Sequence, residues 1–227
     1  MDDSFRAAIT GIGSAVPKKV MTNFDFEKFL DTSDEWITKR TGIKERRIIS
    51  NGESTMTLGT AAAKDALEDA GIDAASLDLI ICATVSPEMM FPATSCFIQE
   101  ALGVKDIPVF DISAACSGFI YALTIGSQFI ETGKYQRVLV IGVDALSKFV
   151  DWEDRSSCIL FGDGAGAVVL QPTNRPDSGV LYTTLKADGS GWDFIHVPGG
   201  GTRNPTTHKT VDEKQHYVKM RGRDVYK

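Results

Sequence analysis

Apolar runs alternate with helical periodicities along most of the chain. Four mainly apolar runs predict β-strands, at Ala7–Ile12, Leu77–Val85, Val109–Ile112 and Val138–Val143, and the continuous run Leu77–Val85 is typical of a strand covered on both faces. Between them, apolar or small residues recur every three or four positions, which predicts helices over Leu58–Ala70, Phe97–Leu102 and Phe119–Ile130, each with a glycine just beyond its end. This alternation predicts an α/β fold with a mostly parallel sheet covered by helices.

A glycine-rich stretch separates two further apolar runs. We interpret Ile159–Leu170 as a hairpin of two strands around the glycines of Gly162–Gly166. The glycine spacing differs from the GxGxxG pattern of nucleotide-binding loops, and no helical periodicity follows. A structural turn is therefore favoured over a phosphate-binding loop.

The polar segment Gln171–Asp177 contains two prolines and is the best candidate for a domain boundary. We predict one domain over residues 1–174 and the start of a second over residues 175–227. The second stretch is short for a domain with a core of its own, so we expect it to be incomplete.

Composition and charge exclude several functions. The 227 residues carry 30 acidic and 24 basic side chains, so broad attraction to nucleic acid or to an anionic membrane is not expected. No apolar run approaches the roughly 20 residues that span a bilayer, and the first residues lack the pattern of a secretory signal. We therefore expect a cytoplasmic protein. Four scattered cysteines without a CxxC pair argue against a metal site, and at least three of them are expected to be small buried residues.

Cys116 is the candidate catalytic residue. It follows the strand Val109–Ile112 within a run of small residues and precedes the helix Phe119–Ile130. A strand-to-helix turn exposes its side chain at the carboxyl end of the sheet, and the amino end of a helix favours negative charge on a nearby sulfur. An accessible thiolate is a nucleophile for acyl transfer, while a buried structural cysteine is the alternative reading.

Several ordered motifs resemble β-ketoacyl-acyl carrier protein synthase III. They are the Asp-Ile-Ser-Ala-Ala-Cys-Ser-Gly-Phe run around Cys116, Asp31–Ile37 with Arg40–Ile43, Phe161–Gly166, Ala187–Ser190 and Met220–Lys227. The resemblance covers the whole chain. It implies the thiolase-like fold of two similar α/β halves, of which residues 175–227 would begin the second, and it implies a homodimer.

The resemblance also implies an activity. Cys116 would accept an acyl group from acetyl-coenzyme A or another short acyl-coenzyme A, and malonyl-acyl carrier protein would then condense with that thioester through decarboxylation. Coenzyme A thioester is the substrate, and no cofactor is implied. The family assigns condensation to a histidine and an asparagine that are not matched here, since His196, His208 and His216 lie outside the family's histidine motif. We therefore expect this chain alone to be inactive in condensation.

The segment Lys39–Arg47 holds five cations and one acid, which fits a phosphorylated or acidic partner, although a solvated charge run is the alternative. By resemblance, Trp36 and Arg155 hold the adenine of coenzyme A and Arg40 its phosphates. The other implied binding residues are Thr32, Thr41, Met220 and Tyr226 in the coenzyme A tunnel and Phe91, which caps the acyl pocket of the dimer partner. Tyr226 and Ser156 depart from the phenylalanine and glycine of the family pattern.

Two other functions stay open. One is a related thiolase-fold synthase, such as a hydroxymethylglutaryl-coenzyme A synthase or a starter enzyme of polyketide pathways, against which the run Thr32–Ile37 argues. The other is a non-catalytic module that binds coenzyme A and dimerises. The extender that is accepted, malonyl-acyl carrier protein or acetyl-coenzyme A, separates the two enzymes.

Overall fold

The computed structural model describes residues 6–175 and 177–226, which form two compact units. Unit 1 joins the segment that ends at Pro17 with Ser50–Asp144 and Gly164–Leu185. Unit 2 joins Lys18–Ile49, Ala145–Asp163 and the segment from Lys186 onward. Each unit thus draws on three segments that are distant in sequence. These units differ in kind from the two successive halves that the sequence predicts, so the boundary near residue 174 stays a prediction.

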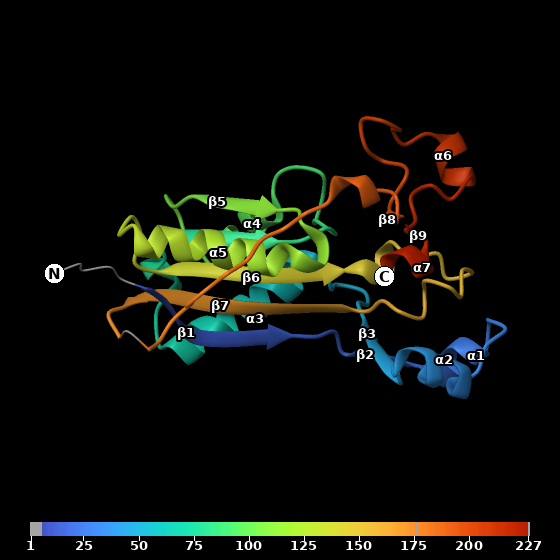
Figure 1. The fold of residues 1–227 in the computed structure, drawn as a ribbon, viewed down its shortest axis with the longest axis horizontal. Helices are drawn as coiled ribbons and strands as arrows, with labels where there is room; N and C mark the ends of the chain where they lie inside the picture. Colours follow the sequence, from blue (N-terminus) through green and yellow to red (C-terminus); the bar gives the residue numbers. More distant parts are fainter. Residues whose placement is uncertain (1–5, 176, 227) are drawn as a thin grey trace. The chain divides into compact units, whose positions relative to one another are not determined.

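Unit 1 is built on a five-stranded sheet of order β1-β7-β6-β4-β5 (Figure 1). Its strands are β1 (Arg6–Ala15), β4 (Leu79–Ala83), β5 (Val109–Ile112), β6 (Val138–Ala145) and β7 (Asp163–Thr173). β4 runs parallel to both β5 and β6, whereas β1 runs antiparallel to β7. The four apolar runs of the sequence therefore are strands of one mixed sheet. β4 is buried along its whole length, as expected for a strand that is covered on both faces.

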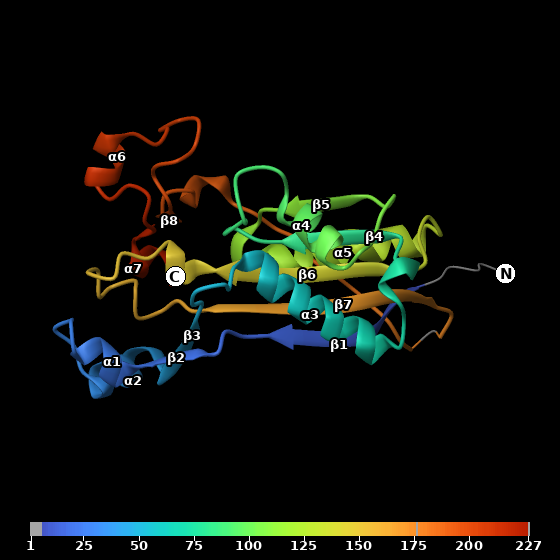
Figure 2. The ribbon, with the colours of Figure 1, turned by 180° about the vertical axis from the view of Figure 1, so that it is seen from behind.

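Helices cover both faces of this sheet, as Figures 1 and 2 show from opposite sides. They are α3 (Thr55–Ala70), α4 (Thr94–Ala101) and α5 (Gly118–Glu131). Alternate residues of β6 show the two contacts: a Cβ at Gly126 of α5 would meet Val138 and Val140, whereas one at Gly59 of α3 would meet Ile141 and Val143. Successive side chains of a strand point to opposite faces, so α5 and α3 lie on opposite sides of β6.

α3 packs directly on β1 and protects this edge strand. The helix begins after Ser54, whose hydroxyl accepts the Thr57 N–H, and ends at Gly71 in the left-handed conformation. The main-chain N–H groups of Ile12 and Ser14 donate to the carboxylates of Asp69 and Asp65 of α3, each at 2.8 Å. Donors on the outer edge of the sheet are thereby occupied by side chains instead of remaining free to pair with another strand.

The predicted hairpin over Ile159–Leu170 is wrong. Ile159 and Leu160 lie in a turn, and a single long strand, β7, runs from Asp163 through Gly164 and Gly166 to Thr173. None of the glycines from Gly162 to Gly166 adopts a positive φ, so the stretch contains no glycine turn. At Gly162 a Cβ would lie 3.0 Å from the Arg46 side chain and 3.1 Å from the Arg47 carbonyl oxygen, which indicates that close packing accounts for this glycine.

Unit 2 contains two short antiparallel ladders and four short helices. The strands are β2 (Lys19–Thr22) with β3 (Glu45–Ile48), and β8 (Ile195–His196) with β9 (Lys219–Met220). The helices are α1 (Asn23–Glu27), α2 (Asp34–Thr41), α6 (His208–Asp212) and α7 (Gly222–Val225). Its buried core joins Phe26 and Ile37 to Val150, Cys158 and Ile159. Side chains from the amino-terminal segment and from the middle of the chain therefore share one small core.

Candidate functional site

Cys116 lies on a short 3-10 turn, Ala115–Ser117, between β5 and α5 of unit 1. Its side chain is exposed, so the sulfur is accessible to a reagent or substrate. α5 begins two residues later, and the N–H groups at a helix start favour an anion nearby. The structure therefore places Cys116 on a strand-to-helix turn, as the sequence predicts.

Close packing and a strained residue shape this turn. Ala115 has a φ of 46°, a conformation that L-residues rarely adopt. At Gly118 a Cβ would lie 3.2 Å from that of Ala83, and at Gly142 one would lie 3.1 Å from the Phe119 ring. The start of α5 thus sits tightly on the carboxyl ends of β4 and β6. Such a turn is held by its surroundings and presents Cys116 outward.

The other cysteines differ in environment. Cys82 and Cys158 are fully buried, whereas Cys96 is half-buried. The expectation that at least three cysteines are small buried residues is therefore met by two of them. Burial raises the pKa of the Cys158 thiol to about 11, and the charge of Asp154 adds to this effect. Cys116 is the exposed thiol of the described residues. No group of three metal-ligating side chains occurs within residues 6–175 and 177–226.

Unit 2 contains a cavity of about 1100 Å³. Six of the predicted binding residues line it: Trp36, Arg40, Thr41, Arg155, Met220 and Tyr226. The lining also includes Leu30, Asp31, Glu153, Asp154, Ser156, Ile159, Leu160, Gly222, Arg223 and Val225. Apolar side chains are thus combined with a smaller number of charged ones in one space, as in many small-molecule sites.

α2 presents Trp36, Arg40 and Thr41 to this cavity. Ser33 caps the helix by accepting the Trp36 N–H at 3.1 Å, and Gly42 ends it with a φ of 74°. Residues four apart share a helix face, so Arg40 lies beside Trp36, and its guanidinium carbon is 4.5 Å from the centre of the indole ring. The cap, the spacing and the glycine stop are all visible in the sequence.

Arg155 approaches the same indole from another segment. Its guanidinium carbon is 5.1 Å from the centre of the Trp36 ring. Arg155 donates a hydrogen bond to the main-chain oxygen of Asp31, whose carboxylate lies 3.6 Å away. An indole with two guanidinium groups over it offers stacking and cation–π contacts to a purine and positive charge to its phosphates.

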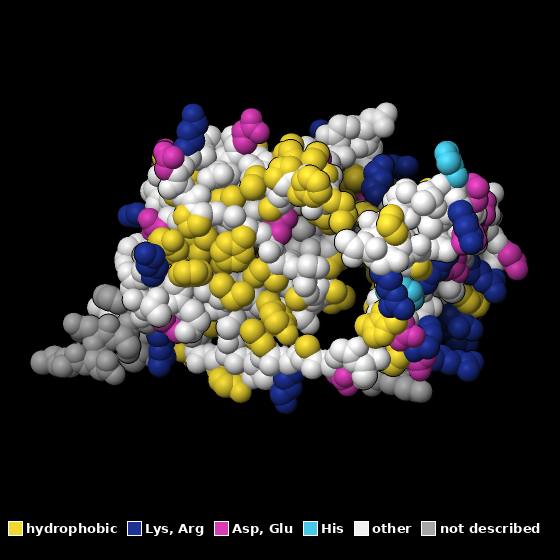
Figure 3. Space-filling view, turned by 90° about the horizontal axis from the view of Figure 1, so that it is seen from above, with side chains coloured by type: hydrophobic (Ala, Val, Ile, Leu, Met, Phe, Trp, Pro, Cys, Tyr) yellow, Lys and Arg dark blue, Asp and Glu magenta, His cyan; other side chains and the backbone are white. Residues whose placement is uncertain are grey.

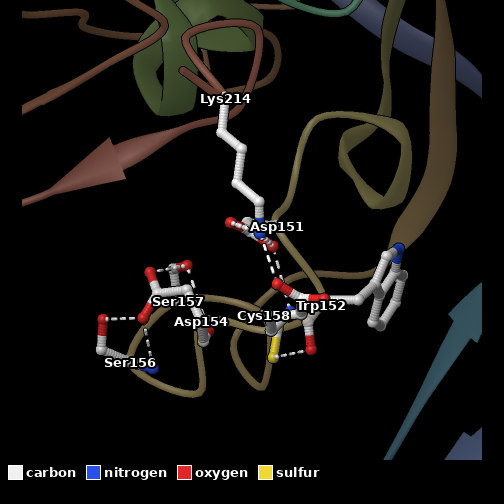
Figure 4. A network of polar contacts seen from close by, with 8 residues as sticks. Asp151, Trp152, Asp154, Ser156, Ser157, Cys158 and Lys214 are labelled. Carbon is white, nitrogen blue, oxygen red and sulfur yellow. Dashed lines mark hydrogen bonds and ion pairs between the residues drawn. The ribbon is translucent and has the colours of Figure 1, made fainter. Parts of the chain in front are cut away.

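Arg155 belongs to a tightly hydrogen-bonded turn, Asp151–Ser157 (Figure 4). The Asp154 carboxylate accepts hydrogen bonds from the Ser156 N–H and from the hydroxyls of Ser156 and Ser157. Burial raises the pKa of Asp154, but these hydrogen bonds and the Lys219 charge outweigh it and leave the pKa below its ordinary value. The serine at 156 therefore has a structural partner in this chain.

Three cations of the cavity differ in their partners. Arg155 is paired with Asp31, whereas Arg40 and Arg223 have no ion pair within the described part of the chain. Sequence reasoning did not single out Arg223, although it lies inside the Met220–Tyr226 motif. The same holds for Asp31, the first residue of the Asp31–Ile37 motif, whereas Glu153 was missed because no local pattern marks a residue whose role depends on a distant loop.

Two predicted binding residues lie elsewhere. The Thr32 hydroxyl is buried without a hydrogen-bond partner among the described residues, and Thr32 is not part of the cavity lining. Phe91 belongs to unit 1, where 83% of it is exposed next to Met90, which is 76% exposed. Figure 3 shows hydrophobic side chains gathered in patches on one face of the molecule. The predicted role of Phe91 in the acyl pocket of a dimer partner stays a prediction.

The basic segment Lys39–Arg47 is not a continuous charged surface. Arg46 is only 6% exposed, and it donates hydrogen bonds to the Asn23 side chain at 2.8 Å and to the Ile159 carbonyl at 2.6 Å. Burial lowers the pKa of Arg46. This cation therefore holds the core of unit 2 together and is not available to a partner, so the binding of an acidic partner stays a prediction for the other four cations of the segment.

The three histidines are peripheral to the cavity lining. His196 contacts the Asp193 carbonyl at 3.1 Å and packs on Trp192, His208 is the first residue of α6, and His216 stacks on Tyr217. None of them lines the cavity of unit 2. No helix within the described residues has both the length and the apolar character that a membrane crossing requires.

Comparisons with known proteins identify relatives over nearly the whole chain. Residues 110–189 match the family described as 3-oxoacyl-[acyl-carrier-protein (ACP)] synthase III. A beta-ketoacyl-[acyl-carrier-protein] synthase III of Caldanaerobacter subterraneus subsp. tengcongensis is 52% identical over 100% of this chain and 68% of its own length. One of Koribacter versatilis is 47% identical over 98% of this chain and 67% of its own length.

Solved structures agree with these relatives. The 3-oxoacyl-[acyl-carrier-protein] synthase III of Aquifex aeolicus VF5 aligns with a TM-score of 0.87 and 49% identity, covering 97% of this chain and 66% of that chain. A priming beta-ketosynthase from the R1128 polyketide biosynthetic pathway aligns with a TM-score of 0.85 and 31% identity over 100% of this chain and 66% of that one. The chain spans about two thirds of the length of these proteins. With this likeness in sequence and its thiolase-like fold, the chain belongs to the β-ketoacyl-[acyl-carrier-protein] synthase III family.

Proposed function

We propose that this chain carries the acyl-transfer part of a synthase that starts fatty-acid elongation. The cavity of unit 2 would bind the coenzyme A portion of a short acyl-coenzyme A, and Cys116 of unit 1 would accept the acyl group. The observation that carries the proposal is the double guanidinium contact on Trp36, 4.5 Å from Arg40 and 5.1 Å from Arg155, in a chain with one exposed cysteine on a strand-to-helix turn.

The proposed chemistry has two steps. The Cys116 thiolate attacks the thioester carbonyl, a new carbon–sulfur bond forms, and coenzyme A leaves as its thiol after taking up a proton. Malonyl-acyl carrier protein then loses carbon dioxide, and the resulting carbanion attacks the Cys116 thioester and releases the thiolate. By family resemblance the second step depends on a histidine and an asparagine that residues 1–227 do not match. We expect the chain alone to be acylated without condensing.

Intact-protein mass after incubation with acetyl-coenzyme A tests the first step. We expect a single acetyl adduct in the unaltered chain and in Cys96→Ala, whose half-buried thiol makes it the matched control, and none in Cys116→Ala. An adduct that persists in Cys116→Ala would overturn the assignment of the nucleophile. Absence of an adduct together with absence of coenzyme A binding would overturn the proposal.

Titration with coenzyme A tests the cavity independently of Cys116. Trp36→Ala removes the stacking surface, which contributes about 1–3 kcal/mol per base, so we expect binding to weaken about 5- to 150-fold. Trp192→Ala is the control, because Trp192 is 58% exposed and lies outside the cavity lining. Equal affinities of the two variants would show that coenzyme A binds elsewhere.

A related priming synthase is the second candidate, favoured by the likeness to the polyketide priming ketosynthase. Primers of increasing length distinguish the two, because a site for acetyl groups discriminates against longer chains.

We also propose a homodimer, as in the family, to which the exposed Phe91 would contribute. Light scattering of the unaltered chain and of Phe91→Asp measures this contribution.

A further inference from the structure

Lys214 occupies a position at which glycine is the usual residue. It follows α6 with a φ of 54°, the left-handed conformation. Its N–H donates to the Val211 carbonyl and the next N–H, of Gln215, donates to the Thr210 carbonyl, both at 2.9 Å. These two bonds form a Schellman C-cap, which glycine adopts without steric cost. A lysine at this position carries a steric cost, which contacts of its side chain can offset.

The side chain of Lys214 joins two carboxylates. Its ammonium nitrogen lies 3.1 Å from Asp151 Oδ2 (Figure 4) and 2.5 Å from Glu153 Oε2. Asp151 is buried, with 9% of its surface exposed, whereas the Glu153 side chain is 84% exposed. The contact to Asp151 is consequently the less screened of the two. In the sequence, the two acids are the immediate neighbours of Trp152.

The two acids belong to the turn that carries Arg155. Asp151 accepts the Asp154 N–H through its carbonyl and the Glu153 N–H through its carboxylate. The turn then continues into Asp154 and Arg155, which line the cavity. A second contact lies near the same segment, where the Val218 N–H donates to the Phe149 carbonyl at 2.7 Å. The segment after α6 therefore holds this turn from one side.

We infer that Lys214 is a positioning residue, which holds the Asp151–Ser157 turn and through it Arg155 in the arrangement that binds a nucleotide. The inference rests on the proposed function, because it takes the cavity to be the coenzyme A site. Lys214 itself is not part of the cavity lining. Its effect on the ligand is exerted through Asp151 and Glu153.

Substitution by glycine separates this role from ordinary stabilisation. Lys214→Gly removes the ammonium and also relieves the left-handed backbone, whereas Lys214→Met removes the ammonium alone. We expect Lys214→Gly to melt at a higher temperature than Lys214→Met, and both to bind coenzyme A about two- to fivefold more weakly than the unaltered chain. Lys214→Arg, which keeps the charge, is expected to restore most of the affinity.

Lys209→Met is the matched control. Lys209 lies on α6 and contacts Glu213 at 3.9 Å, so its loss removes an exposed ion pair of the same segment without touching the turn. Its affinity for coenzyme A should equal that of the unaltered chain. If Lys214→Gly binds coenzyme A as tightly as the control does, the inference is wrong.

Hydrogen exchange distinguishes failure of the inference from failure of the proposed function. The amides of Asp154, Ser157 and Cys158 are all hydrogen-bonded within the turn, and their exchange is measured without any ligand. Faster exchange in Lys214→Gly and Lys214→Met, but not in Lys209→Met, supports the positioning role even if the unaltered chain does not bind coenzyme A. Unchanged exchange in both Lys214 variants overturns it.

Discussion

Gly13 of β1 lies against the backbone of α3, and Gly13→Ala tests how unit 1 is packed. A Cβ at this position would lie 2.2 Å from the Ala62 carbonyl oxygen and 2.3 Å from the Ala66 nitrogen. Both atoms belong to helix backbone, so rotation of a side chain cannot relieve the clash. The helix would have to move away from the strand by roughly 1 Å to reach ordinary van der Waals separation.

The cost follows from what this movement disrupts. Overpacking of a close-packed contact costs about 1–3 kcal/mol. The same movement lengthens the hydrogen bonds that the N–H groups of Ile12 and Ser14 donate to Asp69 and Asp65, and a bond to a charged group contributes about 1.5–3 kcal/mol when it is lost. We take about 3 kcal/mol as the expected loss of unfolding free energy. For a chain of this size that corresponds to a fall of about 6–12 °C in Tm.

Thermal unfolding followed by circular dichroism measures this loss, with Gly166→Ala as the matched control. Gly166 lies opposite Ser14 in the β1–β7 ladder, and a Cβ there would have one neighbour within 4 Å, the Gly13 carbonyl oxygen at 4.0 Å. The control variant should keep its Tm or gain slightly, because alanine restricts the unfolded chain. Equal melting temperatures for the two variants would refute the packing described for β1 and α3.

Two further predictions concern thiol access and acid stability. Iodoacetamide added to the native chain should modify Cys116 in a fast phase, because Cys116 is exposed whereas Cys82 and Cys158 are fully buried. The fast phase should be absent in Cys116→Ala. Mass spectrometry without urea measures the fast phase, and mass spectrometry with urea measures the slower modification of the buried thiols. The folded-state pKa of Asp154 is lowered, so its contribution to stability is present above the unfolded pKa of about 4 and is lost as the pH falls through the folded value. Asp154→Asn should therefore reduce Tm at pH 7 and show a flatter decline of Tm as the pH falls below about 4, and parallel curves for the two proteins would contradict this sign.

Local patterns predicted most elements of unit 1. Val109–Ile112 is a strand with the expected bounds, and Ser54 and Gly71 delimit α3 as N-cap and C-cap. Continuous apolar runs and capping residues act over a few neighbouring positions, so they are readable without knowledge of the fold. The glycine-rich stretch before Leu170 was misread, because a glycine that permits a turn and a glycine that permits close approach have the same letter.

The residues of the candidate site also fall into those that the sequence identifies and those that only the structure identifies. Cys116 could be recognised from its place between a strand and a helix, whereas Trp36 and Arg40 were named through the family resemblance, and their shared face of α2 is seen in the structure. Lys214 could not, because the acids that it contacts lie 61 and 63 positions away in the sequence. Its left-handed φ likewise becomes visible only in three dimensions.

The sequence by itself determined the α/β class, the strand-to-helix turn of Cys116 and the family to which the chain is similar, since each depends on residue types at short and regular spacings. The tertiary structure alone decided which cations line the cavity and which are buried in the core. Arg46 is buried on Asn23 and Ile159, whereas Arg40, only six positions earlier, lines the cavity with Arg155. Two arginines of identical chemistry acquire opposite roles because desolvation and hydrogen-bond partners are set by distant segments that pack around them.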